Sequence, residues 1–246
     1  MKLKIMRWFP LLLLIVLSAS STRAQGISWI DQDLSGPLNA PGSAVTNGDG
    51  SITIQGGGDD IWNATSHCNY YYAWATGTNW TITVDVESFY GPNTWSKVEL
   101  LVDNADLIAG PQGDDAFVSV METQPTTAPL GGVRGMNYFG IDQFRTVRGG
   151  SADWHQANNT PPPSISGNNW MRLVRSGTAF QCWYSYDGVN WTNYTTVDTA
   201  VAQWIGWDNG TSFGPSTAFP NLVCVGVAVT AHNNAVGSYA ALRLPT

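Results

Sequence analysis

Residues 203–222 carry aromatic and polar side chains that can bind a ligand. Trp204, Trp207 and Asp208 stand there among Gly, Asn, Ser and Pro, a composition typical of a loop. The apolar faces of sugar rings stack on tryptophan, and carboxylates accept hydrogen bonds from hydroxyl groups. A large apolar side chain left in water forgoes about 1.5–3 kcal/mol of burial free energy. The segment therefore either folds back onto the protein or meets a ligand, and the sequence leaves both open.

Two aromatic residues outside that segment complete the ligand-binding set that we predict. Trp154 lies in loop-like sequence, and Tyr71 is the middle residue of Tyr70-Tyr71-Tyr72. Successive side chains of a strand point to opposite faces, so at least one of these tyrosines faces outward. An outward tyrosine favours carbohydrate contact, while cross-strand aromatic pairing is the alternative. Five other tryptophans lie in or beside predicted strands and are expected in the core: Trp62, Trp80, Trp95, Trp170 and Trp191.

No catalytic residue is predicted, because the acidic side chains show no suitable pattern. Glycoside hydrolysis needs two carboxyl groups about 5–9.5 Å apart. Asp85 and Glu87 share one face of a predicted strand, but a pair with this spacing is typical of a solvated face. The alternative is an enzyme whose acids, Asp85, Glu87 and Asp208, meet only in the folded protein.

Aspartates gather in predicted turns, where they can hold a structural cation. Asp103, Asp106 and the pair Asp114-Asp115 flank one loop, and Asp49 lies in an Asn-Gly-Asp-Gly turn. Calcium needs six to eight oxygen ligands, and this spacing fits no EF-hand. The three histidines are too dispersed for a zinc motif, and we interpret His232 as a hydrogen-bonded turn residue. We therefore predict no cofactor and no metal ligand, with calcium as the alternative.

The three cysteines, Cys68, Cys182 and Cys224, allow at most one internal disulfide. Cys182 and Cys224 both lie in apolar, strand-like sequence, so this is the pair that we favour. The alternative is that all three are small buried apolar residues.

The N-terminus has the pattern of a secretory signal peptide. Lys2, Lys4 and Arg7 precede an apolar block at residues 11–17, and Thr22-Arg23-Ala24 supplies a small residue for cleavage after Ala24. The block is about half the roughly 20 residues of a membrane span. We expect a leader at residues 1–24, a mature chain at residues 25–246, and no membrane insertion.

The mature chain is strongly acidic. Four of the 11 basic residues lie in the leader, which leaves seven against 18 acidic residues and a formal charge of −11. Phosphate backbones are bound mainly by Lys and Arg, so nucleic acid is not an expected partner. Such a surface suits a neutral ligand or a cation.

Strands dominate the expected secondary structure, because apolar and polar residues alternate with a period of two along most of the chain. No window shows a sustained helical period. The best hairpin joins residues 180–186 to 191–197 through Asp187-Gly188-Val189-Asn190. About 220 mature residues fit one all-β domain. The other expected strands are residues 52–55, 80–87, 96–102, 116–121, 170–175, 223–230 and 238–244.

Several short motifs occur in a defined order along the chain. Asp60-Ile61-Trp62 precedes the tyrosine run, and Trp95-Ser96-Lys97 begins a later strand. The paired arginines Arg145 and Arg148 stand in an aromatic segment, a Ser-Tyr-Asp-Gly hairpin begins at residue 185, and a Val-Thr-Ala-His-Asn segment ends at residue 233. Together these motifs resemble the concanavalin A-like modules of the DUF1349 type found in secreted bacterial proteins.

The resemblance covers residues 29–244 and implies an all-β fold, a concanavalin A-like jelly-roll sandwich of two antiparallel sheets. Lectins, polysaccharide-binding domains and glucanases share that fold, so the fold does not fix the function. The acidic strand motif E-x-D-x-x-E of the glucanases is absent from this chain. The longer aromatic segment at residues 203–222 also departs from the family pattern.

We therefore predict a secreted, non-catalytic module that binds a polysaccharide or another glycan. The resemblance implies a bacterial protein located outside the cell or in the periplasm. A glycan-cleaving enzyme and a structural or adhesion domain with a protein partner are the alternatives.

Overall fold

The computed structural model describes residues 27–36, 38–124, 139–155, 168–202, 210–214 and 217–244. The predicted leader and the three residues Trp204, Trp207 and Asp208 lie outside these ranges. Among the described residues every regular element is a strand, and no helix is long and apolar enough to cross a membrane.

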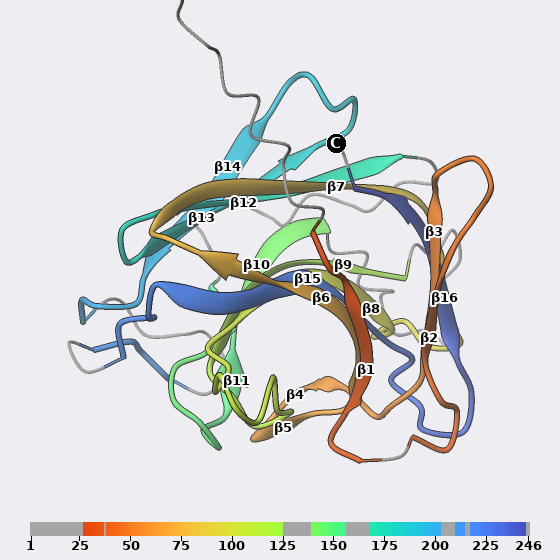
Figure 1. The fold of residues 1–246 in the computed structure, drawn as a ribbon, viewed down its shortest axis with the longest axis horizontal. Coiled ribbons are helices and arrows are strands. Elements are labelled where there is room, and N and C mark those ends of the chain that lie inside the picture. The colour runs from red at the N-terminus through yellow and green to blue at the C-terminus, as the bar shows by residue number, and fades with distance from the viewer. Residues whose placement is uncertain are drawn as a thin grey trace, which may run out of the picture.

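Two seven-stranded antiparallel sheets form the body of the protein (Figure 1). Sheet A contains, in spatial order, β1 (Ile30–Leu34), β6 (Cys68–Thr76), β15 (Leu222–Thr230), β8 (Lys97–Asp103), β9 (Phe117–Thr123), β10 (Phe139–Arg145) and β11 (Ala152–Asp153). Sheet B contains β14 (Thr192–Asp198), β13 (Ala179–Ser185), β12 (Asn169–Ser176), β7 (Asn79–Tyr90), β16 (Ser238–Arg243), β3 (Ile52–Gly56) and β2 (Ser43–Thr46). The predicted all-β sandwich of two antiparallel sheets is confirmed.

The main core lies between the two sheets. Alternate residues of β15, Val223, Val225, Val227 and Val229, point into it, as the strand period of two requires. Complete burial of each such side chain contributes about 1.5–3 kcal/mol. Phe213 also belongs to this core, so the described part of the aromatic segment at residues 203–222 folds back onto the sandwich.

Sheet A is curled, and its concave face, turned away from sheet B, is also covered (Figure 1). A short hairpin of β4 (Ile61–Trp62) and β5 (Thr65–Ser66) lies across this face, with Ile61 fully buried. A second apolar cluster beneath it includes Tyr70, Leu101 and Cys224. Because both faces of sheet A are covered, all seven residues of β8 are buried, including Lys97 and Glu99.

The expected strands agree with the structure to within a few residues. The predicted hairpin is formed by β13 and β14, which pair antiparallel, and Gly188 in its turn has φ +69°. The aromatic segment with paired arginines differs from its expected form, since β10 ends at Arg145. Arg145 is buried on the concave face, whereas Arg148 forms an exposed ion pair with Asp114.

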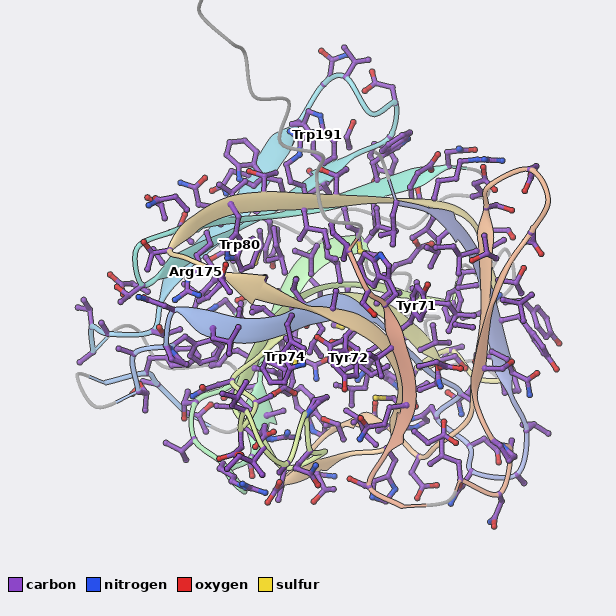
Figure 2. The ribbon with its side chains drawn as sticks, in the orientation of Figure 1. Tyr71, Tyr72, Trp74, Trp80, Arg175 and Trp191 are labelled. Atoms are coloured by element: carbon purple, nitrogen blue, oxygen red, sulfur yellow. The ribbon has the colours of Figure 1, made fainter. Side chains whose placement is uncertain are left out.

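Among the tryptophans that we expected in the core, Trp170 and Trp191 lie on the outer side of sheet B. Trp80 does pack in the main core, 6.1 Å from the ring of Phe180. Trp191 lies on the outer side of sheet B, where the Arg172 guanidinium sits 3.6 Å from the ring centroid (Figure 2). Trp170 is on the same outer side, against Gly188 in the hairpin turn. The expectation was wrong because strand periodicity gives the alternation of side chains but not which side is covered.

The expected disulfide between Cys182 and Cys224 is also contradicted, because all three cysteines are free and buried. Cys182 points into the core between the sheets, while Cys224 points to the concave face of sheet A. Cys68 shares the concave face, but the register pairs Cys224 with Trp74, six residues along β6 from Cys68. At about 3.3 Å per residue this separation is near 20 Å, and a disulfide needs Cα atoms within about 7 Å.

Candidate functional site

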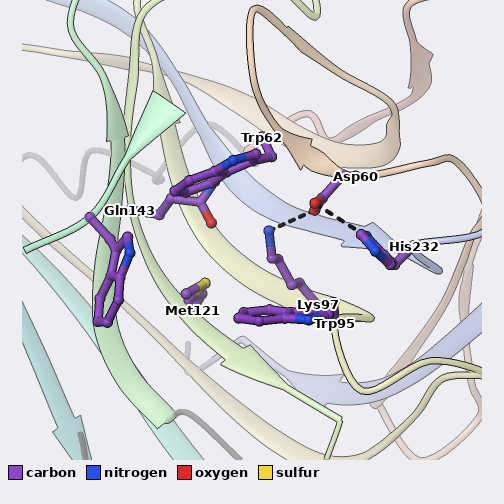
Figure 3. Close-up of a pocket in the computed structure, with 8 residues that line it drawn as sticks. Asp60, Trp62, Trp95, Lys97, Met121, Gln143 and His232 are labelled. Atoms are coloured by element: carbon purple, nitrogen blue, oxygen red, sulfur yellow. Dashed lines mark hydrogen bonds and ion pairs between the residues drawn. The ribbon is translucent and has the colours of Figure 1, made fainter. Parts of the chain in front are cut away.

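A cavity of about 250 Å³ opens on the concave face of sheet A, beside the β4–β5 hairpin. Three half-buried indoles stand around a small group of polar side chains (Figure 3). The lining residues are Asp60, Trp62, Trp95, Lys97, Met121, Gln143, Trp154 and His232. We call this cavity the three-tryptophan pocket.

The β4–β5 hairpin places Asp60 and Trp62 at the pocket. Ile61 is completely buried in the second apolar cluster and anchors the hairpin on sheet A. The backbone carbonyl of Asp60 accepts a hydrogen bond from His67 N at 2.7 Å. Because the intervening Ile61 points inward, Asp60 and Trp62 both reach the pocket. In the Asp-Ile-Trp motif, the middle residue therefore anchors the hairpin and the outer two line the pocket.

Lys97, the first residue of β8, carries a buried positive charge at the pocket. Its Nζ atom lies 2.6 Å from Asp60 Oδ1 and 3.2 Å from the backbone oxygen of Ile61. The same ammonium lies 5.5 Å from the ring centroid of Trp62. A buried charge without a partner is costly, so the ion pair and the carbonyl contact are what allow the ammonium to remain here.

Asp60 is shared between Lys97 and His232. Its second carboxylate oxygen lies 3.2 Å from His232 Nδ1 (Figure 3). Burial would raise the pKa of Asp60, but the nearby Lys97 and His232 outweigh burial and hold that pKa below its ordinary value. The carboxylate is therefore charged at neutral pH and contacts both the Lys97 ammonium and the His232 ring.

His232 follows β15 and occupies a left-handed backbone conformation with φ +50°. Its neighbour Asn233 donates from its backbone N to Gly58 O at 2.9 Å, which fixes the turn. The reading of His232 as a turn residue describes this backbone correctly. Its side chain, in addition, forms part of the pocket wall, which the sequence interpretation missed.

Gln143 and Met121 come from the adjacent strands β10 and β9. Gln143 is fully buried, and its Nε2 atom donates a hydrogen bond to Ile61 O. Its Oε1 atom has no hydrogen-bond partner among the described residues. This buried amide oxygen therefore keeps an unused capacity to accept a hydrogen bond.

A buried carboxyl group lies behind Lys97. Glu99 is fully buried, and Ser119 Oγ donates to its Oε2 atom at 2.6 Å. Burial raises the pKa of Glu99 to about 7, against the opposing effects of Lys97 and of the Ser119 hydrogen bond. Glu99 therefore changes charge near neutral pH beneath the pocket rather than within it.

Trp154 is the one predicted ligand-binding residue that the structure places at this pocket. It follows β11, and its backbone N donates to Asp153 Oδ1 at 2.9 Å. Asp153 Oδ2 accepts from Thr211 N at 3.2 Å and from Thr211 Oγ1 at 3.1 Å. On its other side, His155 contacts the buried Asp142 through Nδ1. Trp154 is thus held between two residues with fixed positions.

Tyr71, the other described candidate, is not part of the pocket lining. It points to the opposite face of β6 from Tyr72 and Trp74 (Figure 2). Its ring stacks on Trp29, with centroids 5.1 Å apart. The aromatic-pairing alternative describes this contact. For Trp204, Trp207 and Asp208, which lie outside the described residues, ligand binding stays a prediction.

The predicted strand pair of acids has other partners. Asp85 accepts a hydrogen bond from Asn168 Nδ2 at 2.8 Å, and Glu87 forms an ion pair with Arg243. Burial is the main cause that raises the pKa of Asp85. Neither residue lines the three-tryptophan pocket.

Two of the aspartates considered for calcium have partners within the protein. Asp106 accepts from the backbone N atoms of Ile108 and Ala109, and Asp114 pairs with Arg148. Among the described residues no group of three or more His, Cys, Asp or Glu side chains is placed to hold a metal ion.

Sequence reasoning assigned Trp62 and Trp95 to the core and gave no role to Lys97 or Gln143. The site could have been predicted from the family motifs, had they been expected to lie together in the folded protein. Asp60-Ile61-Trp62, Trp95-Ser96-Lys97 and the segment containing His232 all supply lining residues, although they are far apart in the chain.

Comparisons with known proteins give neighbours among solved structures only. No family model and no curated protein matches the chain. A functionally unknown protein from Saccharomyces cerevisiae is 13% identical, with a TM-score of 0.43, over 89% of this chain and 97% of its own. The VIP36 exoplasmic/lumenal domain in its Ca2+/Man3GlcNAc-bound form is 10% identical, with a TM-score of 0.43, over 89% and 84%. A putative beta-glucanase from Mycobacterium abscessus is 11% identical, with a TM-score of 0.42, over 89% and 100%. At these identities the function of this chain must be argued from its own residues.

Proposed function

We propose that the protein is a non-catalytic carbohydrate-binding β-sandwich and that its ligand occupies the three-tryptophan pocket. The observation that carries the proposal is the combination of Trp62, Trp95 and Trp154 around the polar side chains Lys97 and Gln143. Ligand sites in proteins typically combine apolar walls with a few placed polar groups. Sugar rings need this combination, because they have apolar faces and hydroxyl edges.

The charges in the pocket argue against other ligand classes. A cation would compete with Lys97, whose ammonium already lies over the ring of Trp62. Nucleic acid is disfavoured because the mature chain has seven basic residues against 18 acidic ones. A neutral ligand rich in hydroxyl groups avoids both conflicts.

The non-catalytic part of the proposal is supported by the carboxylates. Among the described lining residues Asp60 is the one acidic residue, and it is engaged by Lys97 and His232. Glycoside hydrolysis ordinarily uses two carboxyl groups on either side of the scissile bond. We therefore assign the pocket to binding.

We further propose export through a leader at residues 1–24, one module at residues 25–246, and membership of the DUF1349 type. The support is the leader pattern together with the three motifs that converge on the pocket. Trp204, Trp207 and Asp208 remain proposed as additional ligand contacts, on the composition of their segment.

The test is retention of purified residues 25–246 on insoluble polysaccharides and printed glycans, with product analysis on the same samples. Trp62→Ala and Trp95→Ala should each weaken retention at least about tenfold, equivalent to about 1.4 kcal/mol. Trp191→Ala on the outer side of sheet B is the matched control and should bind like the parent. Equal retention by all variants would remove the pocket from the proposal, and release of reducing ends would replace binding with catalysis.

A further inference from the structure

We infer that the three-tryptophan pocket receives one neutral sugar ring at the end of a glycan, with two adjacent hydroxyl groups held by Lys97 and Gln143. This inference rests on the proposed function and adds the charge of the ligand, its orientation and the part of the glycan that is bound. Four features of the pocket carry it: its size, one free donor, one free acceptor and its charge.

The size of the pocket fits a single ring. Its volume of about 250 Å³ is below the about 300–1,000 Å³ typical of pockets for drug-sized ligands. Trp62 and Trp95 lie on opposite sides of the cavity, with the Lys97 side chain between them (Figure 3). A ring can enter between these two indoles, while Met121 and Gln143 on the sheet limit how far it penetrates.

Lys97 supplies one hydrogen-bond donor to the ligand. An ammonium group has three N–H donors. Two are directed to Asp60 Oδ1 at 2.6 Å and Ile61 O at 3.2 Å. The third is available within the described part of the chain, and the ion pair with Asp60 fixes the position of the Nζ atom from which it is donated.

Gln143 supplies the matching acceptor. Its Nε2 atom is committed to Ile61 O, which orients the amide. The Oε1 atom is buried and has no partner among the described residues. A buried acceptor left without a hydrogen bond costs about 1–3 kcal/mol, so a ligand hydroxyl that reaches it gains affinity.

The ammonium and the amide group are neighbours, because Lys97 Nζ and Gln143 Nε2 both contact Ile61 O, and the acceptor Oε1 is the other polar atom of that amide. One ligand hydroxyl can accept from Lys97 while the next donates to Gln143. Adjacent hydroxyl groups on one ring provide this pair of roles without any change in the protein. A glycosidic link at the donating position would remove the hydrogen that Gln143 accepts. A link at the neighbouring position would bring a second ring to a pocket of about 250 Å³, which has room for one, so the bound ring must have both groups free.

The local charge favours a neutral ring over charged ones. The Lys97 charge is balanced by Asp60 at 2.6 Å, so a ligand carboxylate would approach an existing carboxylate. An amino sugar would bring a second ammonium to the one that already lies 5.5 Å from the Trp62 ring centroid. Both approaches are repulsive in a partly desolvated site.

The first experiment titrates the tryptophan fluorescence of the intact protein with methyl pyranosides of neutral hexoses, glucuronate and glucosamine. At least one neutral pyranoside should bind at least about tenfold more tightly than either charged ring, which corresponds to about 1.4 kcal/mol. It should also displace the protein from the glycan that retains it. Equal or tighter binding of a charged ring would overturn the inference.

Failure of the inference and failure of the proposed function give different results. If no glycan retains the protein, the proposed function fails. If a glycan retains it but every single ring fails to compete, the function stands and recognition of a terminal ring is wrong.

The second experiment removes one ligand hydroxyl at a time and needs no variant protein. Loss of either of two adjacent hydroxyls should weaken binding at least about tenfold, and loss of the others should have a smaller effect. In Gln143→Met, the penalty should disappear for the hydroxyl that donates to Gln143 and persist for its neighbour. Trp191→Phe serves as the control variant. A uniform penalty at every position, or the same pattern in Gln143→Met, would contradict the assignment.

Discussion

Glu99, which lies beneath the pocket, makes the stability of the protein depend on pH. The folded protein raises its pKa from 4.5 to about 7, chiefly through burial. A raised carboxyl pKa means that folding favours the protonated form, so the stabilisation is complete below about pH 4.5 and is lost as the pH rises through about 7. The shift corresponds to about 3 kcal/mol in the free energy of unfolding between these limits.

Glu99→Gln should therefore flatten the pH dependence of stability. Glutamine has nearly the same shape, stays neutral and can still accept the hydrogen bond from Ser119. Urea unfolding at pH 5 and pH 8 measures the effect, with the parent losing more stability at pH 8 than the variant. Asp103 and Asp142 are also buried with raised pKa values, so the comparison between the two proteins isolates Glu99. An unchanged difference between the two pH values would contradict the assignment.

The pocket tryptophans mark what residue-level reasoning could and could not predict. Trp154 was predicted because it lies in loop-like sequence. Trp62 and Trp95 were assigned to the core, since a tryptophan beside a strand is usually buried. They are at the surface of a pocket because the β4–β5 hairpin leaves part of the concave face open, and no local pattern encodes that opening.

Among the elements, the β13–β14 hairpin gives the clearest link from sequence to structure. Gly188 in its turn has φ +69°, a conformation that other residues adopt at a cost of about 1–2 kcal/mol. An added Cβ would also lie 2.9 Å from the ring of Trp170. Asp187 Oδ1 accepts from the backbone N atoms of Val189 and Asn190, which closes the turn.

Gly188→Ala should accordingly lower the free energy of unfolding by at least about 1–2 kcal/mol. Thermal or urea unfolding measures this loss. Gly177→Ala is a matched control, because Gly177 has φ +66° but nothing lies within 4 Å of an added Cβ. The excess loss at position 188 reports the Trp170 contact, and equal losses at both glycines would contradict a steric role for Trp170.

The sequence predicted those strands that have one covered face, but it did not predict every strand that is covered on both faces. β3 and β12 alternate buried and half-buried residues, and both were expected from the period of two. β10 is buried at all seven positions and contains Asp, Gln and Arg, so its pattern is not an alternation of apolar and polar residues. A strand of this kind can be predicted only when the polar groups that it contacts on the concave face of sheet A are known.

At the scale of the whole molecule, sheet A separates two chemically different interiors. The core toward sheet B is apolar, as the valines of β15 illustrate. The concave side combines apolar residues with buried ionisable groups, among them Lys97, Glu99 and Arg145. Buried charges need partners from other segments, and the β4–β5 hairpin supplies several of them. The sandwich could be predicted from strand periodicity, whereas this second interior depends on contacts between distant segments.

The separation of the two interiors by sheet A also keeps the cysteines apart as free thiols, which gives a prediction for the whole chain. Cys182 lies on one side of sheet A, Cys68 and Cys224 lie on the other, and burial raises the pKa of all three thiols. A thiol-specific reagent should react slowly with the native protein, because the thiolate is the nucleophile and access is blocked. After unfolding in guanidinium without reductant, three thiols per chain should react. A count of one would mean that a disulfide had formed, which the separation of the three cysteines by sheet A and along β6 does not allow.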